Sequence, residues 1–169
     1  MRYLAIVLSL LLLISCTATY PLGYKIKAYG STAEFVENEA NCKVEYQSHR
    51  YLMSDLDERA DKQLWDEERK MKEQEIWPTG GIIVITVLGP TIESANTKYW
   101  SYVVQTMDGK EILRQQGEPD IAEVPISAYW WNLDTVWINE PMTQPFKLYV
   151  IDELTNRRSG FIIYPDQIL

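Results

Sequence analysis

The chain contains few of the residues on which enzyme and metal sites most often depend. Its 169 residues include one histidine, His49, and two cysteines, Cys16 and Cys42. A histidine-based zinc site or a Ser-His-Asp triad would have to rely on His49 alone, and the cysteines are not spaced as a metal-binding pair. The sequence also has no glycine-rich phosphate loop. We therefore expect no catalytic centre, metal or cofactor, and a hydrolase built from scattered carboxylates is the least supported alternative.

Positive charge and long apolar runs are scarce as well. There are 16 lysines and arginines against 24 aspartates and glutamates, which gives a formal net charge of -8. An acidic surface repels nucleic acid and anionic phospholipid, so we expect neither to bind the folded body. Residues 3–14 form an apolar run interrupted only by Ser9. Because a membrane-spanning helix needs roughly 20 such residues, this run is not expected to span a membrane.

The first sixteen residues have the organisation of a secretion signal. Arg2 supplies one positive charge, an apolar segment follows, and the segment ends in Leu13, Ile14, Ser15 and Cys16. An ordinary cleavage site would need a small residue where Leu13 stands, which makes a secretory signal without lipid the weaker alternative. The run resembles the signal peptide and lipobox of bacterial lipoprotein precursors, in which the residue at the position of Cys16 is lipidated.

The resemblance implies where the mature protein resides. Residues 1–15 would be removed as a signal peptide, and Cys16 would become the lipidated first residue. Several acyl chains hold a protein in a bilayer almost permanently, because each buried methylene contributes about 0.8 kcal/mol. Thr17, and not an aspartate, follows the cysteine, which by analogy with the family favours the outer membrane. We therefore expect a lipid-anchored protein of the cell envelope, with the membrane face left open.

The remaining chain divides into a tether and one domain. Pro21, Gly23 and Gly30 interrupt any regular pattern near the start, so residues 16–31 are predicted to be a flexible tether. Residues 32–169 have the length and composition of a single domain with its own core. With Cys16 lipidated, Cys42 has no partner within the chain. We expect it to be buried as a small apolar residue, with an intermolecular disulfide as the alternative.

The sequence predicts a helix over residues 54–76. Residues 54–76 contain neither glycine nor proline, and Leu56, Ala60 and Leu64 recur at every fourth position. Ser54 is the predicted N-cap. Opposite charges recur four residues apart at Asp55–Arg59, Glu58–Lys62, Asp66–Lys70 and Glu68–Lys72. The pattern predicts one exposed amphipathic helix, interpreted as a solvated connector or, alternatively, as a partner-binding helix that displays Trp65 and Trp77.

The other segments are typical of strands. The Asp108-Gly109 pair predicts a hairpin with a type I′ turn. The short segments between turn signals, without any strand-helix-strand alternation, favour an antiparallel β-sandwich of about seven strands, either immunoglobulin-like or C2-like. The predicted strands cover residues 42–52, 82–88, 98–106, 110–115, 129–138, 146–151 and 160–164.

Aromatic residues are the remaining signal. The chain has six tryptophans and eleven tyrosines, and most are expected to fill the sandwich. Neighbours on a strand point to opposite faces, so one of Trp130 and Trp131 should lie outside the core. A possible interaction surface is thus formed by Trp65, Trp77, Trp130 and Trp131. A calcium site in acidic loops, using Asp134, Asp152 and Glu153, is a weaker candidate.

These features predict a non-enzymatic module that binds or scaffolds another protein of the cell envelope. The alternative is a carbohydrate-binding module that stacks peptidoglycan or a surface glycan on exposed tryptophan and tyrosine rings. The partner, the biological process and the oligomeric state are not specified by the sequence.

Overall fold

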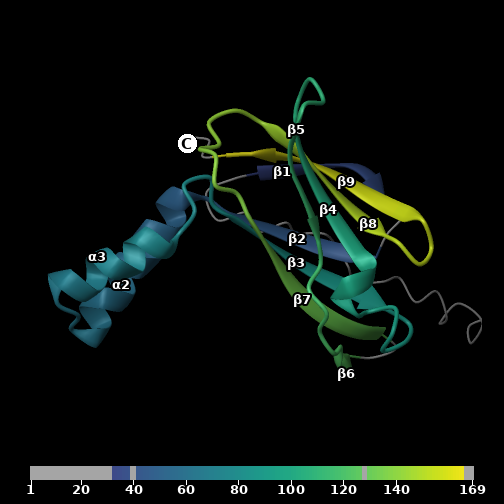
Figure 1. Ribbon diagram of the computed structural model, residues 1–169, viewed down its shortest axis with the longest axis horizontal. Helices are drawn as coiled ribbons and strands as arrows, with labels where there is room; N and C mark the ends of the chain where they lie inside the picture. The colour runs from purple at the N-terminus through teal and green to yellow at the C-terminus, as the bar shows by residue number, and fades with distance from the viewer. Residues whose placement is uncertain (1–31, 39–40, 127–128, 166–169) are drawn as a thin grey trace, which may run out of the picture.

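The computed structural model describes residues 32–38, 41–126 and 129–165. The signal peptide, lipobox and tether predicted within residues 1–31 lie outside this range. The described chain forms two facing β-sheets, and two helices project together from one end of them (Figure 1). Among the described residues, no helix has the length and apolar character needed to span a membrane.

Every strand pair in the two sheets is antiparallel, which confirms the predicted sandwich. The five-stranded sheet has the order β1 (Thr32–Asn38), β9 (Arg157–Tyr164), β8 (Phe146–Asp152), β4 (Trp100–Thr106), β5 (Glu111–Gln116). The four-stranded sheet has the order β2 (Cys42–Gln47), β3 (Ile82–Gly89), β7 (Tyr129–Trp137), β6 (Glu123–Ile126). A short 3-10 helix, η1 (Thr97–Tyr99), precedes β4. The sequence reading missed β1 and β6, and both are edge strands.

The strand order resolves the choice between the two expected topologies. With β2 taken as strand A, the sheets read A-B-E-D and G-F-C-C′, which is the order of an immunoglobulin-like sandwich, and β1 is added beside strand G. Trp100, at the start of strand C, is fully buried, as is typical of that fold. Strands B and F, here β3 and β8, contain no cysteine, so apolar packing holds the sheets together without a disulfide.

The core lies between the inner faces of the two sheets. In β8, the alternate residues Phe146, Leu148 and Val150 are fully buried. They pack in one hydrophobic core with the inward-facing residues of β3, among them Ile83 and Ile85. Each such side chain contributes about 1.5 to 3 kcal/mol when it is fully buried. This core fixes the sandwich as the rigid body from which the helices project.

The β4–β5 hairpin is confirmed, but its turn differs from the predicted one. Gly109 has a φ of 90°, whereas Met107 and Asp108 keep negative φ. The loop therefore has three residues: the Gly109 N–H donates to the Thr106 carbonyl at 3.0 Å, and the Thr106 N–H donates to the Lys110 carbonyl at 2.9 Å. A type I′ turn needs two positive φ values, and only the glycine adopts one without strain.

The predicted single helix is wrong, because two helices occupy this part of the chain. The first, α2 (His49–Gln63), begins five residues before Ser54 and has Ser48 as its N-cap, with the Ser48 hydroxyl accepting the Tyr51 N–H at 3.2 Å. It ends where Leu64 takes a left-handed conformation with φ 53°. The Trp65 N–H then donates to the Ala60 carbonyl at 3.0 Å, which closes the helix end.

The second helix, α3 (Glu67–Ile76), starts at a new cap. The Asp66 carboxylate accepts the Arg69 N–H at 2.8 Å and so acts as the N-cap of α3. The prediction of an Asp66–Lys70 ion pair is therefore wrong. Lys70 Nζ instead lies 2.9 Å from Asp57 Oδ1 on α2. The other three predicted pairs are confirmed, with N–O distances of 3.0, 2.5 and 2.9 Å in chain order. The two helices thus form a hairpin, called the helical hairpin below.

Candidate interaction site

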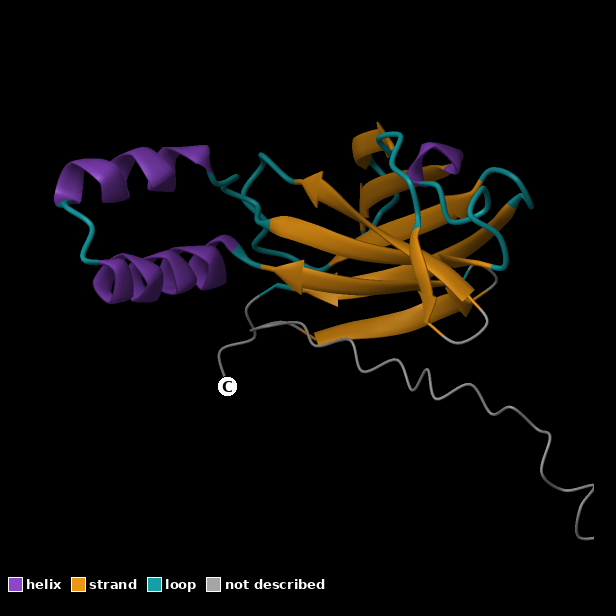
Figure 2. Ribbon diagram, turned by 90° about the horizontal axis from the view of Figure 1, so that it is seen from below, coloured by secondary structure: helices purple, strands orange, loops and turns teal. Residues whose placement is uncertain are grey.

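The helical hairpin is inserted between the neighbouring strands β2 and β3, at a junction that we call the neck (residues 46–49, 77–81 and 137–139). The Tyr46 hydroxyl donates to the Gly80 carbonyl at 2.7 Å, and the Gly80 N–H donates to the Ile138 carbonyl at 2.8 Å. The Ile138 N–H in turn donates to the Gly81 carbonyl at 3.0 Å. Figure 2 shows the two helices running side by side away from the sheets. The neck therefore holds the hairpin through the Tyr46 side chain of β2 and through backbone groups that directly precede β3 and follow β7.

Two aromatic contacts complete the neck. The ring of Trp77, directly after α3, stacks on Trp137 at the end of β7, with centroids 5.7 Å apart and planes 6° from parallel. His49 Nδ1 lies 3.1 Å from the Pro78 carbonyl. Because a carbonyl only accepts, Nδ1 carries the proton in this contact. Trp77 and His49 thus connect the hairpin to the sandwich, and Trp77 is half-buried rather than freely displayed.

Within the helical hairpin, only α2 has buried side chains. Leu52, Leu56 and Ala60 of α2 are buried, whereas α3 has no buried residue. A ten-residue helix is only marginally stable on its own in water. The Asp66 cap, the Lys70–Asp57 ion pair and the Trp77 stack therefore contribute to holding α3 in place.

Large apolar side chains are exposed along the hairpin. The exposed fractions are 90% for Leu64, 55% for Met71 and 57% for Ile76. Leu64 lies at the tip, and its left-handed backbone costs roughly 1 to 2 kcal/mol for a residue with a Cβ atom. Beside it, the Trp65 ring packs under the Arg69 guanidinium, 4.1 Å from the ring centroid. The tip of the hairpin thus carries an exposed apolar side chain beside an aromatic ring and a cation.

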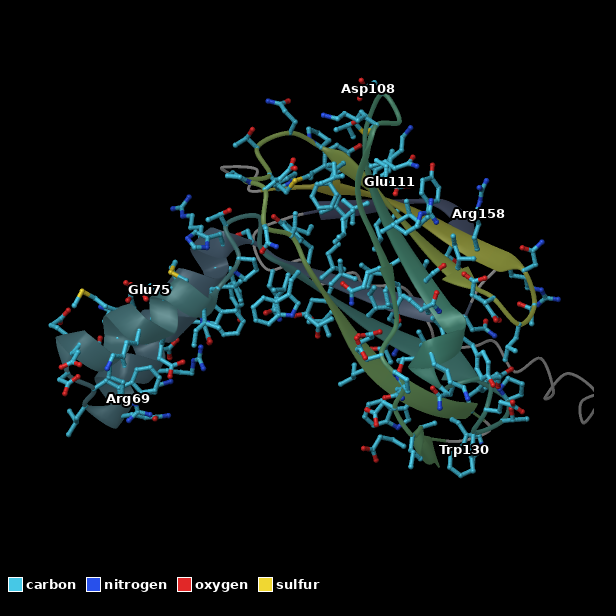
Figure 3. All side chains as sticks on the ribbon, viewed as in Figure 1. Arg69, Glu75, Asp108, Glu111, Trp130 and Arg158 are labelled. Carbon is cyan, nitrogen blue, oxygen red and sulfur yellow. The ribbon has the colours of Figure 1, made fainter. Side chains whose placement is uncertain are left out.

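The other two predicted interaction residues lie elsewhere. Trp130 and Trp131 begin β7, at the end of that strand opposite to Trp137 and the neck (Figure 3). Both are half-buried. Trp131 is paired with Leu88 of β3, which places it on the outer face of the four-stranded sheet. The four tryptophans predicted from the sequence therefore do not form one surface.

The acidic residues considered for calcium do not converge. The Asp152 carboxylate accepts the Leu154 N–H at 3.0 Å and the Thr155 hydroxyl at 2.7 Å, and so it stabilises the β8–β9 turn. Glu153 accepts the Ser101 hydroxyl at 2.6 Å. Within the ranges that the structure describes, no three histidine, cysteine, aspartate or glutamate residues are placed to hold a metal ion.

Asp134 lies between the sheets, against the Tyr102 hydroxyl. Burial is the main cause that raises the pKa of the Asp134 carboxyl, while the hydrogen bond from the Thr135 N–H opposes the rise. Burial and the neighbouring Asp134 charge raise the pKa of Tyr102. Tyr102 is fully buried. A substrate therefore has no access to its hydroxyl, and the pair is a structural feature of the core.

Cys42 is buried at the start of β2, as expected. Burial raises the pKa of its thiol to about 12, and a hydrogen bond with Ser159 opposes this rise. The thiolate is the nucleophilic form, so Cys42 is unreactive near neutral pH. The buried position also leaves no sulfur atom accessible for the intermolecular disulfide that was considered as the alternative.

A shallow groove lies next to the neck, between the β4–β5 turn and the β7–β8 loop. Its apolar lining includes Met107, Ile112, Met142 and Phe146.

Comparisons with protein-family models, curated proteins and solved structures found no match for this chain. Neither the groove nor the Trp77–Trp137 stack could be predicted from the sequence, because both bring together residues that are far apart along the chain.

Proposed function

We propose that the protein is a lipid-anchored component of the bacterial cell envelope that binds another envelope protein through its helical hairpin, without catalysing a reaction. The anchor is Cys16 within the lipobox, and the outer membrane is the favoured location. The observation that carries the binding role is the hairpin itself, which holds exposed apolar side chains away from the sandwich on a hydrogen-bonded neck.

The energetics support a contact at the hairpin tip. Removing apolar surface from water contributes about 25 cal/mol per Å², and the Leu64 side chain is almost fully exposed in the free protein. Arg69, stacked on Trp65, adds a cation and an aromatic ring of the kind enriched at protein interfaces. The polar α3 surface around Met71 would form the rim of the contact. It includes Glu67, four residues before Met71, and Glu75, four residues after it, and Figure 3 shows Glu75 on this helix.

Site-specific photocrosslinking in living cells tests the binding role. A photoreactive residue at position 64 or 71 should yield one discrete crosslinked protein, and the same residue at position 154 should not. Leu154 is a suitable control because it is also exposed but lies in the β8–β9 turn. Equal yields at the three positions, or no product at 64 and 71, would contradict a partner at the hairpin.

Metabolic labelling with a palmitate analogue tests the anchor separately. The wild-type protein should be labelled and should sediment with the outer membrane, whereas the C16S variant should be neither labelled nor retained. Sedimentation of unlabelled C16S with the membrane would show that another part of the chain holds the protein there.

The second candidate is glycan binding at the start of β7. Trp131 faces outward and its ring is partly open to solvent, which is the arrangement that allows an aromatic ring to stack on a sugar. Retention of the protein by isolated peptidoglycan or surface polysaccharide, and loss of retention in W131A but not in W65A, would support this candidate over the hairpin.

A further inference from the structure

The outer face of the four-stranded sheet carries an apolar surface that the described part of the chain leaves open. Apart from Thr86, the residues from Ile82 to Leu88 in β3 are apolar at both sets of alternating positions, which is the pattern of a strand covered on both faces. The inner residues Ile83, Ile85 and Val87 are fully buried, whereas the outward-facing Val84 and Leu88 are only half-buried. In a sandwich whose outer faces meet water, alternate residues of a central strand are normally polar. Apart from Thr86, this strand is therefore apolar on a face that the described chain covers only at its neck end, where Ile82 is buried and Trp77 stacks on Trp137.

Strand register shows how far this surface extends. Residues paired across β3 and β7 form rows, with Leu88 beside Trp131, Thr86 beside Leu133, and Val84 beside Thr135, followed by Ile82 beside Trp137. Leu133 is 49% exposed and Trp137 is 40% exposed. We call these four rows the outer sheet face. The rows are about 7 Å apart, since each lies two residues further along the strands.

The edge strand β2 adds one positive and one negative charge to this face. Lys43 continues the row of Thr86 and Leu133, and Glu45 continues the row of Val84 and Thr135. Neither residue forms an ion pair within the described part of the chain, although Glu45 accepts a hydrogen bond from the Gln47 side chain at 2.9 Å. The two charges are opposite in sign and lie in adjacent central rows.

This order of charges is self-complementary. A two-fold axis that lies in the plane of the face and crosses the strands between these rows would exchange the two rows. It would bring Lys43 of each copy opposite Glu45 of the other. The same rotation would bring the Leu88–Trp131 row opposite the Ile82–Trp137 row, where the Trp77 ring lies on Trp137, so that the Leu88–Trp131 row of one copy meets this aromatic pair of the other.

We propose that the outer sheet face binds the same face of a second copy of this chain, forming a symmetric dimer. Sheets that pack face to face in proteins lie about 10 Å apart, with their side chains interdigitated. The rotation reverses the strand direction, so the necks and helical hairpins of the two copies lie at opposite ends of the dimer. This dimer does not depend on the proposed hairpin contact, which uses a different surface.

The test is the protein mass in solution, measured by light scattering on the whole lipidated protein in detergent after subtraction of the detergent contribution. Over concentrations of about 1 to 100 µM, the wild type should approach the mass of two chains. L133D should raise the dimer dissociation constant by at least about a hundredfold, because the dimer would bury two uncompensated charges. L154D is the matched control, since Leu154 is 48% exposed on a turn outside this face.

Charge reversal provides a second test that does not disturb the apolar rows. K43E and E45K should each raise the dissociation constant roughly tenfold, because two symmetry-related attractive contacts become repulsive. The double variant K43E/E45K restores the opposite pairs and should return to the wild-type value. A monomeric wild type, equal effects of L133D and L154D, or a double variant weaker than either single one would each overturn the proposal. Circular dichroism of every variant checks that the fold is intact.

Discussion

Trp77 and Trp137 stack with their ring planes 6° from parallel, although 60 positions separate them along the chain. One ring belongs to the end of α3 and the other to the end of β7. The stack is therefore one of the side-chain contacts that orient the helical hairpin relative to the sheets, together with the Tyr46–Gly80 hydrogen bond and the backbone hydrogen bonds of the neck.

Removing one ring of this stack should loosen the hairpin and leave the sandwich intact. An aromatic pair contributes about 0.5 to 1.5 kcal/mol beyond its buried area, so W137A should raise amide hydrogen exchange in α3 by roughly tenfold. Amides of β4 and β8 should exchange as in the wild type. W137F, which keeps a ring, is the control and should show a smaller effect. An equal rise in exchange over helices and strands would mean that the stack supports the whole fold.

Leu64 should be replaceable by glycine with a gain in stability. Glycine adopts the left-handed conformation without the cost that a Cβ atom imposes, so L64G should raise the free energy of unfolding by about 1 kcal/mol. L64A keeps a Cβ atom and should stay close to the wild type. Urea denaturation of the three proteins measures the difference. A loss of stability in L64G would show that the leucine side chain packs in the free protein, contrary to its exposure.

The same L64G substitution should weaken partner binding, because it removes the exposed side chain at the hairpin tip. Photocrosslinking from position 71 in an L64G background compares the two effects directly. A more stable protein with a lower crosslinking yield is the expected result. An unchanged yield would assign the contact to Met71 and Ile76 rather than to the tip.

Asp134 should contribute more to the free energy of unfolding at acidic pH than at neutral pH. Burial raises its pKa in the folded protein above the ordinary value of 3.8. The fold thus favours the protonated form, and its stabilising contribution is fully present below pH 3.8 and is lost as the pH rises through the folded pKa. D134N should therefore be more stable than the wild type at neutral pH, and this advantage should vanish in acid. Urea denaturation at several pH values measures it, and an advantage that grows on acidification would contradict this account.

Cys42 should be protected from alkylation in the native protein. Its thiol pKa of about 12 and its burial leave almost no reactive thiolate at pH 8. Iodoacetamide should label Cys42 at least about a hundredfold faster in urea than in buffer, as followed by mass spectrometry. The unfolded protein serves as the control for intrinsic reactivity. Rapid labelling of the native protein would show that β2 opens at the edge of its sheet.

The sequence predicted those strands in which apolar residues alternate in the same way as buried positions do. Phe146, Leu148 and Val150 alternate in β8 because one face of that strand is in the core. The missed strands β1 and β6 lie at sheet edges, where pairing on one side suffices and the pattern is weaker. β6 even contains Pro125, which an edge strand tolerates because its N–H need not pair.

The candidate site was less accessible to sequence reasoning. Trp65 and Trp77 were identified from their place on an acidic helical segment, but the break at Leu64 was missed because leucine is a good helix former. Asp66 carries the signal that could have found it, since an aspartate before an acidic run is also a helix N-cap. The neck and the outer sheet face depend on strand order, which spacing along the chain does not define.

The insertion of the hairpin between β2 and β3 has a mechanical consequence. These strands are adjacent and antiparallel, and their paired residues nearest the neck are Gln47 and Ile82. A pull on the hairpin tip would therefore load β2 and β3 together in one direction, and β3 would have to shear past β7 with many hydrogen bonds loaded at once. The Gly80–Ile138 hydrogen bond and the Trp77–Trp137 stack transfer part of that load to β7. The junction thus sets the force at which a pull on the hairpin would displace β3 from β7.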